Sequence, residues 1–220
     1  MAAPQPAAIT SLNPIASEQD GFFSSAQAQA VGVDDGRLAR LLQDGYVERS
    51  VRGVYRVVTG VTIVTHVPEW LYVRYLALDA QRLPWERGSS PGVVVSHSSA
   101  ADLLGLGSLP ADIAEFTSVR RKSTVLPAVR IRQAGLPPQD WSWRESGRIP
   151  VTTAARTAVD LALVGVGRDY VEAIVAQALQ RQLATLAELR SALARRRGHA
   201  RTASVAWLDG FLAEVGNHDE

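Results

Sequence analysis

Three side chains in the N-terminal part of the chain are suited to reading DNA. Arg37, Arg40 and Gln43 lie at intervals of three residues in a segment whose leucines have helical periodicity. This spacing places them on one face of the expected helix, opposite the leucines. Arginine carries a planar fork of hydrogen-bond donors that fits guanine edges and phosphate groups. The segment is therefore predicted to be a recognition helix that enters the major groove.

More arginines follow in a segment that favours β-structure. Two β-prone runs within residues 46–58 predict a hairpin with a short loop at residues 50–53. Arg49 and Arg52 bracket this loop and Arg56 lies on the return strand, so all three are predicted to contact backbone phosphates. The alternative is a winged helix that contacts protein, because five arginines and four acids between residues 21 and 58 leave a net charge of only +1.

Start and stop signals place these arginines in a defined order of elements. A first helix is expected from Asn13, and Ser24 with Gln27 forms a capping box for a second. An aspartate at position 34 or 35 begins the third helix, and Gly45 lies just beyond its last turn. Three helices followed by a hairpin are typical of a winged helix-turn-helix domain.

The rest of the chain is predicted to form a mixed α+β domain. An amphipathic helix is expected over residues 68–81 and a buried strand over 93–95, and Ser99-x-x-Asp102 is expected to cap the next helix. Strands exposed on one side are predicted at residues 113–119 and 128–133, and helices predominate from residue 153 onward.

The fold class predicted for the whole chain is α+β. The domain organisation is a disordered lead-in over residues 1–12, a winged helix-turn-helix DNA-binding domain over 13–60, and an α+β domain over 66–216 with strands early and helices late.

The second domain contains two basic stretches without acids. They comprise Arg120, Arg121, Lys122, Arg130 and Arg132 in the first, and Arg190, Arg195, Arg196, Arg197 and Arg201 in the second. Such a density of positive charge could bind a polyanion such as DNA or RNA. Solvated strand faces and a helix C-terminus, where the helix dipole favours cations, explain the same residues equally well.

The stretch of residues 149–162 contains one oppositely charged pair. Arg156 and Asp160 are four residues apart on a predicted helix, and an ordinary surface pair at this spacing stabilises a helix by roughly 0.2–0.5 kcal/mol. No histidine lies near this pair in the sequence, so the stretch offers no nucleophile and base.

Two enzymatic interpretations have weaker support in the sequence than DNA binding has. The Ser96, His97 and Asp102 side chains invite comparison with a catalytic triad, but a strand end that enters a capped helix explains them without chemistry. Asp112 and Glu115 would serve a metal-dependent nuclease, but its companion E-x-K pattern is missing. The chain also lacks cysteine, metal-ligand spacing among its four histidines, and a glycine-rich phosphate loop, so no metal or cofactor is expected.

Composition narrows the class of protein further. The 220 residues carry 23 basic and 22 acidic side chains, a formal net charge of +1, so any nucleic-acid contact must come from a local patch. No apolar run approaches the roughly 20 residues that cross a bilayer, and residues 1–8 do not form a secretory signal. A cytoplasmic protein without membrane contact is expected.

Several segments resemble a known family. The N-terminal ones are GFFSSAQA at residues 21–28, GV at 32–33, LARLL at 38–42, GYVER at 45–49 and RGVYR at 52–56. They resemble the winged-helix domain of AbiEi-type antitoxins, from the AbiE type IV toxin–antitoxin systems linked to abortive phage infection. HSSAA at residues 97–101 and the 149–162 stretch, with PVT and ARTAVDLA, are similar to the C-terminal antitoxin domain of that family.

The resemblance implies two activities and no catalysis. The winged helix would bind inverted repeats in operator DNA and repress its own operon, with the five arginines and Gln43 as contacts. The C-terminal domain would counteract a nucleotidyltransferase-like toxin, often without a stable complex, and Arg156 and Asp160 lie in its most recognisable stretch. One departure is the acidic Asp34-Asp35 pair at the start of the recognition helix, which leaves room for weak DNA affinity. No dimerisation helix is evident, so a monomer in solution is expected.

Overall fold

The computed structural model describes residues 7–58, 67–86, 91–143, 149–196 and 202–218, which form two compact units. The first unit consists of the described residues of 1–93, 124–127 and 145–149. The second consists of the described residues of 94–123, 128–144 and 150–220.

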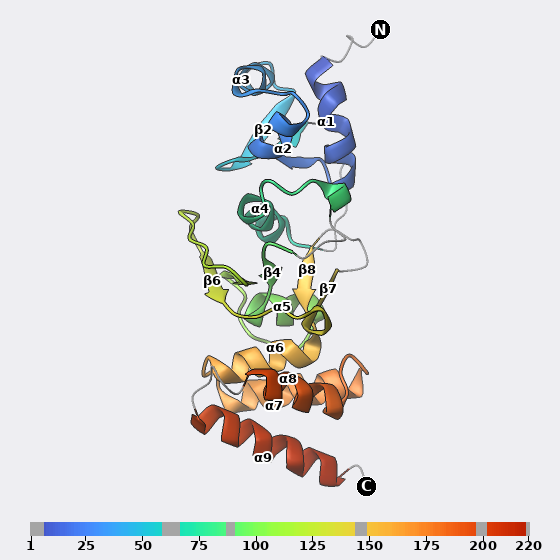
Figure 1. Cartoon of the computed structure of the whole chain (residues 1–220), viewed down its shortest axis with the longest axis vertical. Coiled ribbons are helices and arrows are strands. Elements are labelled where there is room, and N and C mark those ends of the chain that lie inside the picture. The colour runs from blue at the N-terminus through green and yellow to red at the C-terminus, as the bar shows by residue number, and fades with distance from the viewer. Residues whose placement is uncertain (1–6, 59–66, 87–90, 144–148, 197–201, 219–220) are drawn as a thin grey trace. The chain divides into compact units, whose positions relative to one another are not determined.

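The first unit has the winged-helix order of elements (Figure 1). Its elements are α1 (Ala7–Glu18), β1 (Phe22–Ser24), α2 (Ser25–Ala30), α3 (Asp35–Gln43), β2 (Val47–Val51), β3 (Val54–Val57), α4 (Glu69–Leu78) and the short 3-10 helix η1 (Pro84–Glu86). The three strands form an antiparallel sheet in the order β1-β3-β2. The winged helix-turn-helix fold predicted from the sequence is confirmed.

Local signals account for most boundaries in this unit. Ser24 caps α2 and forms the predicted capping box with Gln27, and Asp34 caps α3 by accepting a hydrogen bond from the Arg37 N–H group. Gly45 follows α3 with a φ of 74°, a left-handed conformation that glycine adopts without strain. The wing narrows to a two-residue turn between Val51 and Val54, which pair across the hairpin.

The first helix begins earlier than the sequence analysis expected. It starts at Ala7 rather than Asn13, so residues 7–12 are helical and not a disordered lead-in. Ile9 and Leu12 are 1% and 0% exposed and continue the apolar face of Ile15 into the core. The Ala- and Pro-rich composition of the N-terminus concealed this face.

The winged helix also extends beyond the predicted boundary at residues 60–66, since α4 contacts all three strands of the first sheet. The Ser24 hydroxyl donates to the Ala80 carbonyl, and the Gln27 amide donates to the Arg82 carbonyl. These bonds satisfy the buried polar groups of Ser24 and Gln27 at the start of α2, so residues 67–86 belong to the winged-helix unit.

The second unit is a mixed sheet followed by helices, as predicted. Its elements are β4 (Val94–Val95), α5 (His97–Leu104), β5 (Ala114–Ser118), β6 (Val129–Gln133), η2 (Pro138–Asp140), β7 (Trp141–Trp143), β8 (Pro150–Thr152), α6 (Ala154–Leu163), α7 (Arg168–Gln180), α8 (Leu186–Arg196) and α9 (Thr202–His218). The sheet order is β6-β5-β4-β8-β7, with parallel β5–β6 and β4–β8 pairs and antiparallel β4–β5 and β7–β8 pairs.

Two predictions for this unit were wrong, and two strands were not predicted. Strand β5 is buried along its whole length: it lies between β4 and β6 in the sheet, and α5 packs against it. Helix α5 begins at His97 with Ser96 as its N-cap residue, so Ser99 is inside the helix and does not cap it. Strands β7 and β8 were missed, since segments of three residues carry too little alternation to be recognised.

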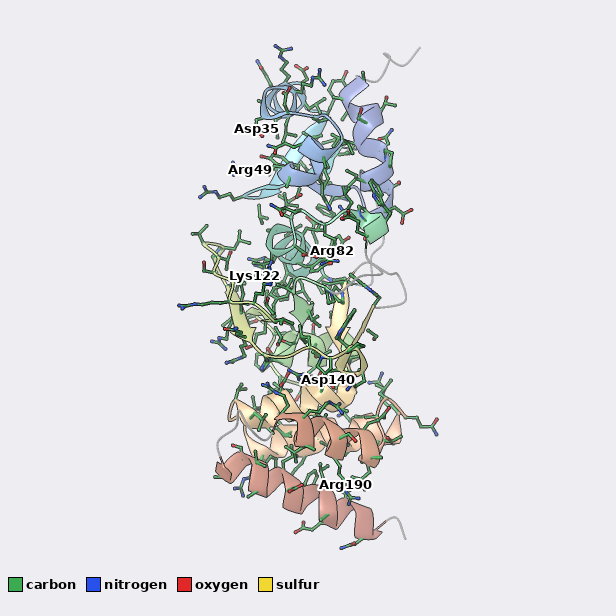
Figure 2. All side chains as sticks on the ribbon, viewed as in Figure 1. Asp35, Arg49, Arg82, Lys122, Asp140 and Arg190 are labelled. Atoms are coloured by element: carbon green, nitrogen blue, oxygen red, sulfur yellow. The ribbon has the colours of Figure 1, made fainter. Side chains whose placement is uncertain are left out.

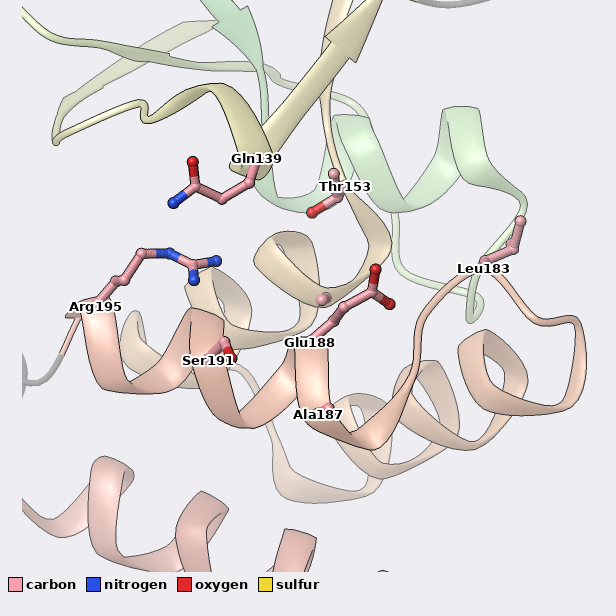
Figure 3. A pocket seen from close by; sticks show the side chains of 8 residues that line it. Gln139, Thr153, Leu183, Ala187, Glu188, Ser191 and Arg195 are labelled. Carbon is pink, nitrogen blue, oxygen red and sulfur yellow. The ribbon is translucent and has the colours of Figure 1, made fainter.

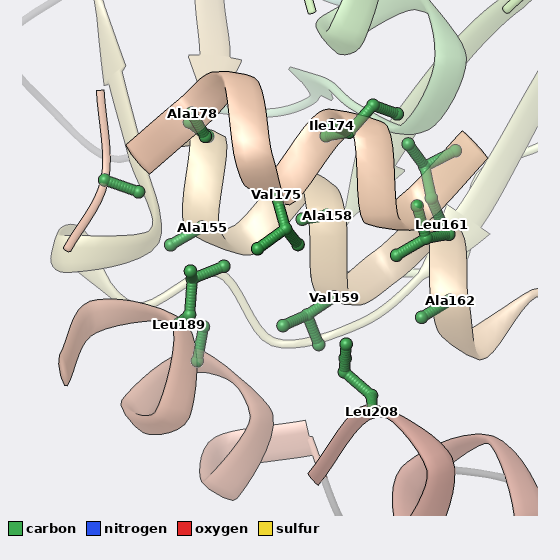
Figure 4. Packing of buried hydrophobic residues seen from close by; sticks show 14 of the residues in the cluster. Ala155, Ala158, Val159, Leu161, Ala162, Ile174, Val175, Ala178, Leu189 and Leu208 are labelled. Atoms are coloured by element: carbon green, nitrogen blue, oxygen red, sulfur yellow. The ribbon is translucent and has the colours of Figure 1, made fainter. Parts of the chain in front are cut away.

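The core of the second unit lies among its helices (Figure 4). Side chains of α6, α7, α8 and α9 meet in one apolar cluster, in which Ala158, Ile174, Leu189 and Leu208 are each 0% exposed. Small residues on α6 let the neighbouring helices approach closely, and this helix contacts α5, α7, α8 and α9. Helix α6 is therefore the centre on which the C-terminal part of the unit is built.

Candidate nucleic-acid interface and the polar clusters of the second unit

Helix α3 presents the three predicted DNA-reading side chains to solvent. Leu38 and Leu41 are 3% and 4% exposed and anchor the helix in the core, while Arg37, Arg40 and Gln43 are exposed on the other face. The geometry is that of a recognition helix in a winged helix-turn-helix domain.

Arg37 is already engaged at the start of this helix. Its Nη1 atom donates to the Gly32 carbonyl at 2.8 Å, and its Nε atom lies 3.9 Å from a carboxylate oxygen of Asp34. Within the described part of the chain, Arg40 and Gln43 form no comparable contact. Arg40 is therefore the side chain of α3 best placed to meet a base or a phosphate.

The wing separates its arginines into two groups. Arg49 (labelled in Figure 2) is exposed on strand β2, and Arg52 is exposed in the turn at the tip of the hairpin. Arg56 is only partly exposed, because its guanidinium lies 5.2 Å from the centre of the Phe22 ring and 3.6 Å from the Glu69 carboxylate. Of the three arginines predicted to contact phosphates, Arg49 and Arg52 are thus exposed to solvent, whereas Arg56 packs against the protein.

The first basic stretch of the second unit lies on β6 and on the connection that precedes it. Arg120 and Arg121 are exposed and Lys122, labelled in Figure 2, is half-buried. Arg130 and Arg132 lie on β6, and each points a guanidinium nitrogen at the Glu115 carboxylate, at 3.2 and 3.3 Å. Arg120, Arg121 and Arg130 are therefore the exposed cations of this stretch, although Arg130 is also paired with Glu115.

Glu115 has an ionic structural role that the sequence did not indicate. Its carboxylate accepts hydrogen bonds from the backbone N–H and the hydroxyl of Ser98, at 3.1 and 2.6 Å. Burial alone would raise the pKa of Glu115, but the hydrogen bonds from Ser98 and the nearby positive charge of Arg132 hold the pKa below its ordinary value. Glu115 is thus an ion-pair centre, and Asp112 lies exposed before the strand. In the described ranges no three His, Asp or Glu side chains are placed to share a metal ion.

The triad interpretation of Ser96, His97 and Asp102 does not match the geometry. His97 is 2% exposed, and its Nδ1 atom lies 2.8 Å from the Ser96 hydroxyl, which in turn accepts a bond from Thr117. Asp102 is exposed on α5. Desolvation by burial lowers the pKa of His97 to about 4, so the ring is neutral near neutral pH and packs as a buried polar group.

Arg156 and Asp160 form a buried ion pair, so the prediction that they form a pair on the surface was wrong. Arg156 is 0% exposed, and its Nε atom donates to Asp160 at 2.7 Å. Its Nη1 atom donates to Asp140 at 2.6 Å and to the Gly135 carbonyl at 3.0 Å. The missed partner is Asp140, which lies on η2 and is labelled in Figure 2.

Two further arginines extend this pair into a chain of alternating charges, the Arg156 network. Arg195 donates from Nε and Nη2 to Asp140, and Arg196 donates from Nε to Asp160 at 3.2 Å. Arg195 and Arg196 at the end of α8 are thus paired with buried acids, while Arg197 and Arg201 of the same basic stretch lie outside the described residues. The network ties η2, α6 and α8 together with three arginines and two aspartates.

A pocket of about 340 Å³ adjoins this network (Figure 3). It lies between η2, the first turn of α6 and α8. The lining residues are Gln139, Thr153, Ala155, Leu183, Ala187, Glu188, Ser191 and Arg195. It combines one guanidinium, one carboxylate and three neutral polar side chains, a set suited to orienting a small polar molecule.

One comparison with known proteins bears on the function. Residues 11–58 match the family model described as "Transcriptional regulator, AbiEi antitoxin". The matched segment runs from within α1 to the end of the hairpin, so the resemblance to AbiEi-type antitoxins is confirmed there. The family is one of regulators and antitoxins rather than of enzymes. No curated protein matches the chain. Among the described helices, none has the length and apolar character needed to span a membrane.

Proposed function

Since residues 11–58 carry the AbiEi antitoxin signature, we propose that this chain represses its own operon by binding inverted repeats in operator DNA and that it counteracts a nucleotidyltransferase-like toxin. Such a regulator acts in the cytoplasm, and one monomer would occupy each repeat. The observation that supports DNA binding best is the exposure of Arg40 and Gln43 on the outer face of α3.

The proposed contacts divide into two kinds. Arg40 and Gln43, with Arg37 at the start of the helix, would meet base edges in the major groove. Arg49 and Arg52 would hold phosphates from the wing. Arg56 would act indirectly, because its contact with Phe22 braces the strand that carries the wing.

Binding to a labelled fragment of the upstream promoter, measured by fluorescence anisotropy at two salt concentrations, tests this assignment. Arg40→Ala should weaken binding by about 1–3 kcal/mol, and the Arg49→Ala, Arg52→Ala double variant should lower the salt slope by about 2. Arg168→Ala, an exposed arginine of the second unit, is the matched control. Undiminished binding by the Arg40→Ala variant would contradict the proposed recognition helix.

A second candidate function is an antitoxin whose winged helix contacts protein instead of DNA. The contacts of Arg37 with Asp34 and of Arg56 with Glu69 favour it, since they neutralise part of the positive charge. This candidate predicts no binding to the promoter fragment, but rescue of growth when the chain is co-expressed with its proposed nucleotidyltransferase-like toxin.

The antitoxin activity is assigned to the second unit. Arg120 and Arg121 are exposed beside the half-buried Lys122, and these three cations would meet the toxin or a nucleic acid that both proteins share. Arg156 and Asp160 support this unit from within and touch no partner. Replacing the three surface cations by glutamine should reduce growth rescue and leave promoter binding by the first unit unchanged.

A further inference from the structure

The pocket beside the Arg156 network has opposite charges at its two ends (Figure 3). Arg195 and Glu188 project from the same side of α8, and Gln139 and Thr153 face them from η2 and from the residue before α6. Seven residues separate the two charged positions along the helix, a rise of about 10.5 Å. Ser191 lies between them on the same face.

The positive end of the pocket is held in place by a buried acid. Arg195 binds Asp140 through Nε and Nη2, and the Asp140 side chain is 1% exposed while that of Arg195 is 31% exposed. In the described part of the chain the Nη1 group of Arg195 forms no hydrogen bond. The guanidinium is therefore fixed on one edge and can donate to a ligand from the other.

The negative end is organised in the same way. One carboxylate oxygen of Glu188 accepts bonds from the Thr185 backbone N–H and hydroxyl, at 2.7 and 2.9 Å, as part of the cap of α8. Its second oxygen forms no hydrogen bond within the described residues. A cation that reached it would meet a carboxylate whose conformation is already set, which lowers the entropic cost of binding.

The local charge balance indicates which class of molecule fits. The Arg156 network contains three arginines and two aspartates, and Glu188 supplies a third carboxylate, so the formal charges around the pocket cancel. A simple anion or cation would leave one end unpaired. A molecule that carries both charges, separated by a chain of several bonds, would pair with both.

We propose that this pocket binds a small elongated zwitterion of the basic amino acid class, with its carboxylate on Arg195 and its side-chain ammonium on Glu188. The hydroxyls of Ser191 and Thr153 and the Gln139 amide oxygen line the pocket between the two ends, where they can accept hydrogen bonds from the α-ammonium group of the ligand. The apolar atoms of Leu183 and Ala187 line the end of the pocket near Glu188. The proposal does not depend on DNA binding or on toxin neutralisation.

The test uses the full chain and four probes that share a six-carbon chain and differ in the charged groups that it carries. Isothermal titration calorimetry and thermal unfolding are measured with L-lysine, 6-aminohexanoate, hexanoate and hexylamine. L-Lysine and 6-aminohexanoate should raise the unfolding temperature with increasing concentration. Hexanoate and hexylamine should bind at least about tenfold more weakly, since each lacks one charge-assisted hydrogen bond.

One substitution separates ligand binding from folding. Glu188→Gln keeps an acceptor for the α8 cap, since glutamine also serves in a capping box, but it removes the charge. We expect it to weaken 6-aminohexanoate binding at least about tenfold and to leave hexanoate binding unchanged. Glu172→Gln on α7, outside the pocket, is the matched control and should bind all four probes as the wild type does.

A second variant fills the pocket without changing any charge. Ser191→Leu should abolish binding of both zwitterions while the far-ultraviolet circular dichroism spectrum stays that of the wild type. The proposal is overturned if no probe stabilises the chain, if hexanoate binds as tightly as 6-aminohexanoate, or if Glu188→Gln binds 6-aminohexanoate like the wild type.

Discussion

Replacing Arg156 by methionine should cost far more stability than its sequence context predicts. Methionine has a similar length and no charge, so the change removes the guanidinium while it fills most of the space. The variant loses the bonds to Asp160, Asp140 and the Gly135 carbonyl. Two buried carboxylates then depend on Arg195 and Arg196 alone.

The magnitude follows from the burial of these groups. The side chains of Arg156, Asp140 and Asp160 are 1%, 1% and 0% exposed, so solvent screens their interactions little. Breaking a buried ion pair from one side costs about 3–5 kcal/mol, mostly because the remaining charge stays desolvated. Arg195 and Arg196 retain part of the compensation, so we expect about 3 kcal/mol at the lower end of this range. A surface pair at the same spacing contributes only roughly 0.2–0.5 kcal/mol.

Urea denaturation followed by far-ultraviolet circular dichroism measures the difference. Arg121→Met, an exposed arginine of the same unit, is the control and should change the free energy of unfolding by no more than about 0.5 kcal/mol. A cost of less than about 1 kcal/mol for Arg156→Met would contradict the stabilising role of the buried ion pairs.

Three further substitutions test other parts of the fold. The pKa of His97 is lowered to about 4 by burial, below its unfolded value of 6.5, so its contribution to stability is complete above pH 6.5 and falls as the pH drops toward 4. The backbone φ of His97 is 54°, a conformation that asparagine tolerates, so His97→Asn should remove about 3 kcal/mol of the acid-induced loss measured between pH 7 and pH 4. Gly107→Ala places a Cβ atom 2.8 Å from Ile174 Cγ1 at a φ of 67°, and thermal unfolding should show a loss of about 1–3 kcal/mol; an unchanged melting temperature would contradict this packing. Ser24→Ala removes the α2 cap and the bond to Ala80, and a urea titration should report a loss of about 0.5–2 kcal/mol, whereas a neutral result would exclude the cap as a stabilising contact.

The structural features that depend on residues close together in the chain could be predicted from the sequence. The Ser24 and Asp34 caps, the leucine face of α3 and the hairpin depend on neighbours in the chain, and the structure has them where the sequence placed them. The exposure of Arg40 follows from the same periodicity, since the core-facing positions of a short amphipathic helix determine its outer face.

Long-range contacts explain what the sequence did not indicate. Asp140 is 16 residues from Arg156 and 55 residues from Arg195, so no local pattern connects the members of the network. Nothing in a spacing of four residues shows whether a pair is buried, and the pair was therefore predicted to lie on the surface. Glu115 is a similar case, because its arginine partners lie on the neighbouring strand β6.

The bonds from α2 to Ala80 and Arg82 have a consequence for how this kind of domain can be transferred between proteins. The family signature ends at residue 58, but Phe22 packs edge-on against Tyr72 of α4 at 6.0 Å. A fragment cut at the end of the signature would leave the Ser24 hydroxyl and the Gln27 amide without their acceptors and expose the Phe22 ring. The smallest portable version of this winged-helix module therefore ends near residue 86, and a gene fusion joined at residue 58 would carry an incomplete one.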